Sequence, residues 1–275
     1  MDKKLITLFT NNTQASQNAV QSISSKIEEN GFAVSYEFSH DSDLIMCIGG
    51  DGAFLSAVRN FNFPAVPFVG INTGHLGFFQ EIYPSQLDPF LENYKQGKYH
   101  IQRLKTVKAN ITTGQKSFEH IGLNEIVIKG GSSYPIHLNT SIGGGFIERF
   151  SGDGILVATP AGSTAYNYSL GGSIVDPRLN LLQVTPIAPM NTTAYRSFTS
   201  SLLLPSDLSF GVTPERELDY NMVIIIDGIA YNYNDISQIN ICFSEAIVNL
   251  IRFESYDFWT KVKTKFLDNN ASEYE

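Results

Sequence analysis

One carboxylate stands inside a run of glycines at positions 49–52, Gly49-Gly50-Asp51-Gly52. The apolar run before it, residues 44–48, predicts a buried strand, and residues 53–61 after it have helical composition and spacing. Glycines let the backbone approach a ligand, and free N–H groups at a helix start attract anions, above all phosphate. Asp51 adds a group that can hold Mg²⁺ or take a proton from an attacking hydroxyl. The pattern indicates a phosphate site with a base, although Asp51 could also be a simple helix N-cap.

A second group of small and hydroxyl side chains occupies residues 151–177. It opens with Ser151-Gly152-Asp153-Gly154, continues as a predicted strand to Thr159-Pro160, and then enters a turn from which a short helix begins near Ser163. Hydroxyls and exposed amides gathered at such a turn suit a ribose or a phosphate. The same composition is also typical of a loop that only connects two elements.

Two adjacent hydrogen-bonding side chains, Asn124 and Glu125, precede the apolar run 126–128. At the end of a strand, Asn can recognise an amide or purine edge, and Glu can accept hydrogen bonds from ribose hydroxyls. An exposed strand start would explain the pair equally well.

Composition limits the classes of protein to consider. Of 275 residues, 43% are hydrophobic and 17% are charged, which indicates a globular chain of one or two domains. The net charge is −8, and the 19 Lys and Arg residues form no stripe, which argues against binding to nucleic acid. The N-terminal apolar run is too short for a signal peptide, and no stretch approaches the ~20 apolar residues that span a bilayer. We therefore expect a cytoplasmic protein with no membrane partner.

The cysteines and histidines indicate no zinc site. Cys47 and Cys242 each lie inside an apolar run, so we expect two buried core thiols in a reducing compartment. The five histidines are dispersed, without the spacing of metal ligands. No metal held by the protein's own side chains is predicted.

The first hundred residues alternate between predicted strands and helices. The strands are expected at 5–9, 32–38, 44–48 and 66–71, and the helices at 15–30, 53–61 and 84–96. Strands separated by helices imply a mostly parallel, Rossmann-like sheet covered on both faces. Ligands of such sheets bind beyond the carboxyl ends of the strands, where the 49–52 turn lies.

The pattern changes after about residue 100. Short strands are predicted at 106–112, 117–121, 125–129, 136–142, 146–150, 155–158, 201–204, 222–226, 238–243 and 246–251, with hairpin turns at 143–145 and 227–228. This density of short strands indicates an antiparallel, sandwich-like β domain. From Arg252 onward, an aromatic run and a short basic helix are expected to pack back onto the first domain. We therefore expect an α/β domain at 1–100 plus 252–275 and a β-rich domain at 101–251.

Taken together, the 49–52 turn, the Asn124-Glu125 pair and the block Thr-Pro-Ala-Gly-Ser-Thr-Ala-Tyr at 159–166 resemble the NAD kinase family, in its bacterial type. The segments 70–78 and 169–175 extend the match, which covers about residues 44–228 in the expected order. Lipid kinases and phosphofructokinases carry similar glycine turns, so the 159–166 block decides the resemblance. It implies an α/β domain, a β-rich domain and a returning tail. It also implies a homodimer or homotetramer whose substrate lies between the domains, with help from a neighbouring subunit.

The resemblance implies transfer of the γ-phosphate of ATP to the 2′-hydroxyl of the adenosine ribose of NAD, which yields NADP. A divalent cation, Mg²⁺, is implied with ATP, or with polyphosphate as an alternative donor. Asp51 matches the catalytic base. The positions that match NAD-binding residues are Asp51, Gly52, Phe79, Asn124, Glu125, Asp153, Thr164, Ala165, Tyr166, Ser169 and Ala188. The positions that match phosphate-binding residues are Gly49, Gly50 and Gly52.

This sequence departs from the family pattern at two positions. Ala53 stands where the family usually has Thr, so a hydroxyl near the catalytic turn is missing. Ser151 stands where many members have a basic residue.

Two other functions are compatible with part of the pattern. A related lipid or small-alcohol kinase would keep the glycine turn but would not need the 159–166 block. A catalytically silent dinucleotide-binding sensor would fit Ala53, although the presence of Asp51 argues against it.

Overall fold

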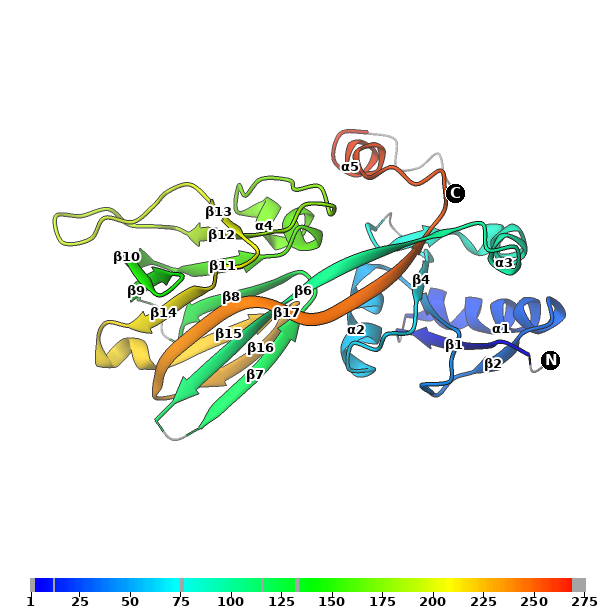
Figure 1. The fold of residues 1–275 in the computed structure, drawn as a ribbon, viewed down its shortest axis with the longest axis horizontal. Helices are drawn as coiled ribbons and strands as arrows, with labels where there is room; N and C mark the ends of the chain where they lie inside the picture. The colour runs from blue at the N-terminus through cyan, green and yellow to red at the C-terminus, as the bar shows by residue number, and fades with distance from the viewer. Residues whose placement is uncertain (1–2, 12, 75–76, 115, 132–133, 269–275) are drawn as a thin grey trace. The chain divides into compact units, whose positions relative to one another are not determined.

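The structure is a computed structural model that describes residues 3–11, 13–74, 77–114, 116–131 and 134–268 (Figure 1). The chain divides into two compact units, Met1–Leu104 with Ile247–Glu275 and Lys105–Ala246. Two long strands, β6 (His100–Thr113) and β17 (Ile236–Arg252), each contribute residues to both units.

The first unit is built on a parallel sheet in the order β2-β1-β3-β4, with β5 and the end of β17 pairing in parallel with β4. The strands are β1 (Leu5–Thr10), β2 (Ala33–Ser35), β3 (Leu44–Ile48), β4 (Phe68–Ile71) and β5 (Gln80–Ile82). All five residues of β3 are fully buried, because helices cover both faces of the sheet (Figure 1).

The described residues of this unit form four helices, in addition to the 3₁₀ turn η1 (Pro84–Gln86). They are α1 (Gln14–Glu29), α2 (Asp51–Asn60), α3 (Leu87–Lys95) and α5 (Phe258–Phe266). Met46 and its alternate neighbours in β3 belong to one core cluster with apolar side chains of α1 and α3. On α2, the ring of Phe54 packs against that of Phe68 in β4, with centroids 5.5 Å apart. The helix α5 begins where the Asp257 side chain accepts a hydrogen bond from the Thr260 N–H at 2.7 Å.

The second unit is a sandwich of antiparallel strands. One sheet has the order β13-β12-β11-β8-β15-β16, and the other contains β10-β9-β14-β17 together with β6 and β7. The strands of the first sheet are β8 (Glu125–Gly130), β11 (Gly154–Ala158), β12 (Leu181–Ile187), β13 (Leu202–Pro205), β15 (Met222–Ile226) and β16 (Ile229–Tyr233). The second sheet adds β7 (Ser117–Gly122), β9 (Ile136–Ile142), β10 (Gly145–Gly152) and β14 (Phe210–Pro214) to β6 and β17.

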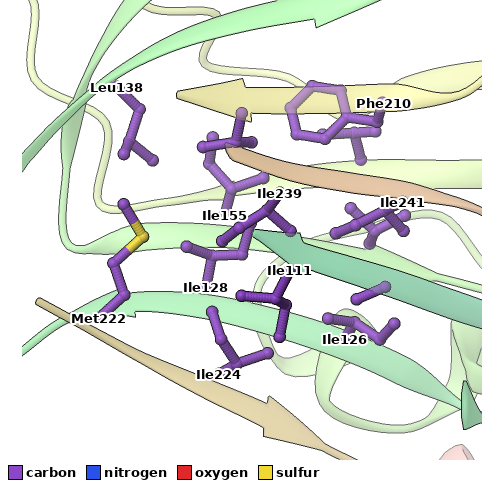
Figure 2. Close-up of a cluster of buried hydrophobic side chains, with 14 of the residues drawn as sticks. Ile111, Ile126, Ile128, Leu138, Ile155, Phe210, Met222, Ile224, Ile239 and Ile241 are labelled. Carbon is purple, nitrogen blue, oxygen red and sulfur yellow. The ribbon is translucent and has the colours of Figure 1, made fainter. Parts of the chain in front are cut away.

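Alternate residues of both sheets meet in one apolar core (Figure 2). Ile126 and Ile128 come from β8, and Ile239 and Ile241 come from β17. Their spacing of two residues is that of strand side chains pointing to one face. Branched aliphatic side chains therefore fill the space between the sheets. Between β11 and β12 the chain forms the 3₁₀ turn η2 (Ala161–Thr164) and the short helix α4 (Tyr166–Ser169), and η3 (Glu217–Tyr220) precedes β15.

The fold class expected from the sequence is confirmed: an α/β unit with a parallel sheet, a β-rich unit, and a C-terminal segment that returns to the first unit. Several element predictions were wrong in detail. Residues 238–243 and 246–251 belong to a single strand, β17, and the strand predicted at 32–38 is only Ala33–Ser35. The strands β5, β12, β14 and β16 were not predicted.

The two thiols differ in burial. Cys47 is fully buried, which raises the pKa of its thiol, whereas Cys242 is only half-buried, contrary to expectation. Within the described ranges, no helix has the length and apolar character needed to cross a membrane.

Candidate functional site

Asp51 is the first residue of α2, directly beyond the carboxyl end of β3. The N-cap is Gly50, so the alternative of Asp51 as an N-cap is wrong. Instead its carboxylate accepts two backbone hydrogen bonds, Oδ2 from the Phe78 N–H at 3.0 Å and Oδ1 from the Phe79 N–H at 2.9 Å. The Lys265 Nζ lies 3.8 Å from Oδ2. The side chain remains 28% exposed, so the carboxylate is fixed and still accessible.

This approach of Asp51 to the backbone depends on a glycine. A Cβ added at Gly77 would lie 2.4 Å from Asp51 Oδ1 and 1.9 Å from Gln80 Oε1. The space that a side chain would occupy is therefore taken by these two polar groups. Both atoms of the Gln80 carboxamide are buried without a hydrogen-bond partner.

The glycines of the turn differ in their surroundings. The Gly49 N–H donates to the Ile71 carbonyl at 2.9 Å, within the strand pairing. A Cβ at Gly50 or Gly52 would meet nothing within 4 Å, so no neighbouring group crowds the side-chain position of these two glycines. A Cβ at Gly49 would lie 2.6 Å from the Cβ of Ala53, the residue that departs from the family pattern.

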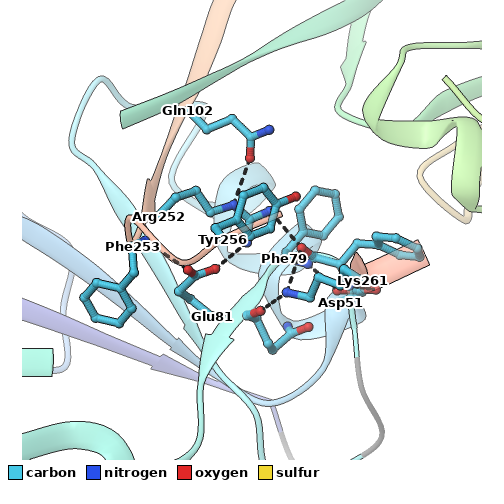
Figure 3. Close-up of polar contacts among 10 residues, drawn as sticks. Asp51, Phe79, Glu81, Gln102, Arg252, Phe253, Tyr256 and Lys261 are labelled. Atoms are coloured by element: carbon cyan, nitrogen blue, oxygen red, sulfur yellow. Dashed lines mark hydrogen bonds and ion pairs between the residues drawn. The ribbon is translucent and has the colours of Figure 1, made fainter. Parts of the chain in front are cut away.

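The segment that holds Asp51 is itself held by cations (Figure 3). Arg252 Nη2 donates to the Phe78 carbonyl at 2.9 Å, and the Arg252 Nη1 pairs with Glu81 Oε2 at 2.8 Å. Lys261 Nζ donates to the carbonyls of Phe78 and Gln80. The Phe79 ring is buried and stacks on Phe54 with centroids 4.7 Å apart.

In the second unit, the start of β8 is fixed by a residue of the β15–β16 hairpin. Asp227 has φ +46°, and its carboxylate accepts the N–H groups of Leu123, Asn124 and Glu125 at 2.7, 2.8 and 3.2 Å. Three amide donors fix the position of this carboxylate. Asp227 thus binds the backbone N–H groups of Asn124 and Glu125. The side chains of Asn124 and Glu125 are left for other partners.

Asn124 and Glu125 are 6% and 7% exposed, and each has a buried oxygen without a hydrogen-bond partner, Asn124 Oδ1 and Glu125 Oε2. A buried polar atom left unpaired costs about 1–3 kcal/mol. Burial, with a smaller contribution from the negative charge of Asp227, raises the pKa of Glu125 to about 8. These two oxygens are the groups that a ligand would satisfy.

The turn after β11 lies directly on this pair. The Thr159 N–H donates to the Asn124 carbonyl at 2.9 Å, and Thr159 Oγ1 donates to the Leu123 carbonyl at 2.7 Å. A Cβ at Gly162 would lie 2.0 Å from the Asn124 carbonyl oxygen, so only glycine permits this contact. The structure therefore brings Asn124 and Glu125 together with η2.

The remaining predicted residues fall into two groups. Four continue from η2 into α4: Thr164 is buried, Ala165 is half-buried, and Tyr166 and Ser169, at the two ends of α4, are exposed. Asp153 and Ala188 lie at the opposite end of β11, where the Asp153 N–H donates to the Ile187 carbonyl at 2.9 Å. The five residues of β11 separate its two ends by about 16 Å, because a strand rises about 3.3 Å per residue. The structure does not bring these two residues to the Glu125 end of the unit.

Ser151, the second departure from the family pattern, is buried, and its Oγ lies 3.4 Å from His137 Nε2. Residues 75 and 76 of the 70–78 segment lie outside the described residues. Among the residues that the structure describes, no group of three His, Cys, Asp or Glu side chains could hold a metal ion.

Sequence reasoning missed three residues that hold the site together: Asp227, Arg252 and Lys261. Asp227 was noted only as part of a hairpin turn, and its side chain acts on residues more than a hundred positions earlier. The signal for Arg252 was its place at the end of an apolar run, because a lone arginine there needs a buried partner. Nothing distinguishes Lys261 from the other lysines of the basic tail.

A carboxylate in a glycine turn beyond the carboxyl end of a parallel strand, in one chain with a β-sandwich, is the arrangement expected of a two-unit phosphate-binding protein. Family models identify it further. Residues 1–99 match the ATP-NAD kinase N-terminal domain, and residues 123–253 match the ATP-NAD kinase C-terminal domain. The chain belongs to the NAD kinase family, as its sequence motifs predicted.

Similar proteins span nearly the whole chain. An NAD kinase of Finegoldia magna is 37% identical over 270 residues, which are 97% of this chain and 99% of that protein. NAD kinase 1 of Listeria innocua is 32% identical over 241 residues, 85% of this chain and 90% of that protein.

Two solved structures share the fold. A yeast NADH kinase complexed with NADH has a TM-score of 0.83 at 21% identity and covers 96% of this chain and 87% of its own. An NAD kinase from Archaeoglobus fulgidus in complex with ATP has a TM-score of 0.76 at 22% identity and covers 94% of this chain and 99% of its own.

Proposed function

We propose that this chain is an NAD kinase that transfers the γ-phosphate of ATP to the 2′-hydroxyl of the adenosine ribose of NAD. The observation that carries the proposal is the carboxylate of Asp51, held by two backbone amides in an accessible glycine turn, in a chain of this family. Neither a lipid kinase nor a silent sensor is favoured by the relatives.

In this proposal Asp51 is the general base. Phosphoryl transfer needs mainly in-line positioning and charge stabilisation, so the protein must place the hydroxyl and draw off its proton. A carboxylate can accept about four hydrogen bonds, and two are used by Phe78 and Phe79, which leaves lone pairs for the ribose hydroxyl. The open backbone at Gly50 and Gly52, at the start of α2, faces the donor phosphates.

NAD recognition is assigned to the second unit. Asn124 Oδ1 and Glu125 Oε2 accept hydrogen bonds from the adenine amino group and the ribose hydroxyls, which removes the cost of leaving them unpaired. Thr164, Ala165, Tyr166 and Ser169 add contacts from the adjoining η2 and α4. Gly52 and Phe79 of the first unit are proposed as NAD-binding residues on the family resemblance alone.

A divalent cation, Mg²⁺, and an oligomer complete the proposal. The described residues offer no cluster of protein ligands, so the cation is carried by the donor phosphates, and Asp51 is the one acidic side chain at the turn available to it. It would neutralise phosphate charge there. Asp153 and Ala188, remote from Glu125 within one unit, fit contacts to the dinucleotide of a neighbouring subunit in a homodimer or homotetramer. A cytoplasmic location is part of the same proposal.

The experiment is a coupled assay of NADP formation with the variant Asp51→Asn. The amide keeps the volume and can still hydrogen-bond, but it cannot take a proton at neutral pH. We expect kcat to fall by roughly 10²–10⁴-fold, while the Kd for NAD changes much less. Asp41→Asn, an exposed aspartate of the same unit, is the matched control. Near-normal turnover of Asp51→Asn would remove Asp51 from the role of base.

A further inference from the structure

A single peptide group joins Asp51 to the C-terminal segment. The Phe79 N–H donates to Asp51 Oδ1 at 2.9 Å, and the carbonyl of the same peptide, that of Phe78, accepts from Arg252 Nη2 at 2.9 Å and from Lys261 Nζ at 3.4 Å (Figure 3). Because the peptide group is planar, fixing its oxygen also fixes the direction of its N–H. Two cations at the carbonyl end polarise the group and strengthen the hydrogen bond that the N–H donates.

Arg252 is held rigidly in this arrangement. It is 2% exposed, and its remaining donors reach Gln102 Oε1 at 2.8 Å, Glu81 Oε2 at 2.8 Å and the Tyr256 hydroxyl at 3.2 Å. The Tyr256 ring also lies against the guanidinium, with the Arg252 Cζ 3.8 Å from the ring centroid. Partners at Nε, Nη1 and Nη2 and a ring against one face hold the planar guanidinium in place, so the Phe78 carbonyl meets a fixed donor.

Lys261 binds the same segment at two points, the carbonyls of Phe78 and Gln80. Burial, followed by the charge of Arg252, lowers its pKa to about 8; Lys265 acts in the same direction, and Glu81 and Asp51 act against it. The ammonium group is therefore charged at neutral pH and loses its charge in mildly alkaline solution.

We propose that Arg252 and Lys261 are positioning residues for Asp51, which act through the Phe78–Phe79 peptide to keep the carboxylate oriented for proton abstraction. The proposal rests on the proposed role of Asp51 as base. It gives the returning C-terminal segment a part in the reaction in addition to its packing on the first unit.

The test replaces Lys261, because removing Arg252 would leave Glu81 as a buried, unpaired charge and endanger folding. In Lys261→Met we expect kcat to fall about tenfold, with KM for NAD within about twofold of wild type. A decline of kcat above about pH 8 in the wild type should vanish in the variant. Lys263→Met, an exposed lysine two residues away on α5, is the matched control.

A double variant separates positioning from a general structural role. If Lys261 acts through Asp51, Asp51→Asn/Lys261→Met should be no slower than Asp51→Asn alone, whereas two independent effects would multiply. Lys261→Arg, which keeps charge and donors, should recover part of kcat. Should Lys261→Met not fold, Lys261→Gln keeps a donor toward the Gln80 carbonyl and tests the loss of charge by itself.

The inference is overturned if kcat of Lys261→Met and its decline above about pH 8 match those of Lys263→Met, or if the effects of the double variant multiply. Failure of the proposed role of Asp51 as base gives a different result, because Asp51→Asn itself would then turn over normally.

Discussion

Glu125 is a carboxyl group in surroundings that oppose its charge. It is buried beside the Asp227 carboxylate, which accepts three backbone amides, and one of its own oxygens has no partner. With its pKa raised to about 8, the side chain is largely protonated at neutral pH. It can therefore donate a hydrogen bond to a ligand as well as accept one.

The stability of the protein should depend on pH through this residue. The pKa of Glu125 is higher in the folded state, so the folded protein binds the extra proton between the unfolded value of about 4.5 and about 8. The stabilisation is fully present below about pH 4.5 and is lost as the pH rises through about 8. Over this range we expect a loss in the free energy of unfolding on the order of 5 kcal/mol, which urea denaturation would measure. In Glu125→Gln this slope should vanish, while the exposed control Glu37→Gln keeps it. Parallel pH profiles in the wild type and Glu125→Gln would contradict the assignment.

Tyr166 is a second side chain whose role can be isolated. Its ring is 38% exposed at the start of α4, where it can lie along the dinucleotide. In Tyr166→Ala we expect KM for NAD to rise roughly tenfold, with KM for ATP nearly unchanged, because we propose that the donor phosphates bind at the glycine turn. Tyr168→Ala, on the same helix and similarly exposed, is the control in steady-state assays. Equal changes of KM for both substrates would mean that α4 organises the whole site, and no change for either would place this block outside it.

At the scale of elements, the site of the second unit depends on the contact between η2 and the start of β8. Gly162 permits it, because its Cα lies against the Asn124 carbonyl. In Gly162→Ala the new methyl group would collide with that oxygen, and we expect a loss of roughly 1–3 kcal/mol in stability together with weaker NAD binding. Urea denaturation and calorimetry would measure the two effects. Gly114→Ala, where a Cβ would meet nothing within 4 Å, is the control, and equal behaviour of both variants would contradict the prediction.

The elements that the sequence predicted well have strong local signals. The strand β3 and the strands β9 and β15 match their predicted bounds, because continuous or alternating apolar residues are bordered by turn residues. The turn at Asp227-Gly228 was predicted because both residues tolerate positive φ, and they have φ +46° and +83°.

The elements that were missed depend on tertiary context. β12 and β14 contain Pro186 and Pro214, which weaken a strand pattern, yet each pairs with neighbours on both sides. β17 was divided at Ser244-Glu245 because polar residues interrupt the apolar run there, but the strand continues from one unit into the next. The β-propensity of a few residues cannot predict a strand that forms because neighbouring strands pair with it.

At the scale of the whole molecule, the sequence identified the proposed site residues but not the groups that hold them. Asp51 is bound by amides 27 and 28 positions later, and Phe78 by an arginine 174 positions later. Motifs report residues that face a ligand, whereas a buried ion pair such as Arg252–Glu81 becomes evident only when the fold brings its members together. In each unit, residues outside the sequence motifs therefore hold the proposed site residues in place. They are Arg252 and Lys261 in the first unit and Asp227 in the second.

The proposed cation should be needed for turnover and not for folding. Structural metal sites stabilise a fold through several protein ligands, whereas we propose that this cation is carried by the donor phosphates. Excess EDTA should therefore abolish NADP formation while the melting temperature changes by less than about 1 °C. A shift this small corresponds to a change of less than about 1 kcal/mol in the free energy of unfolding. Restoring Mg²⁺ should restore activity without refolding. A large fall in melting temperature with EDTA would show that the protein itself binds a metal ion, and would contradict a cation carried by the donor nucleotide.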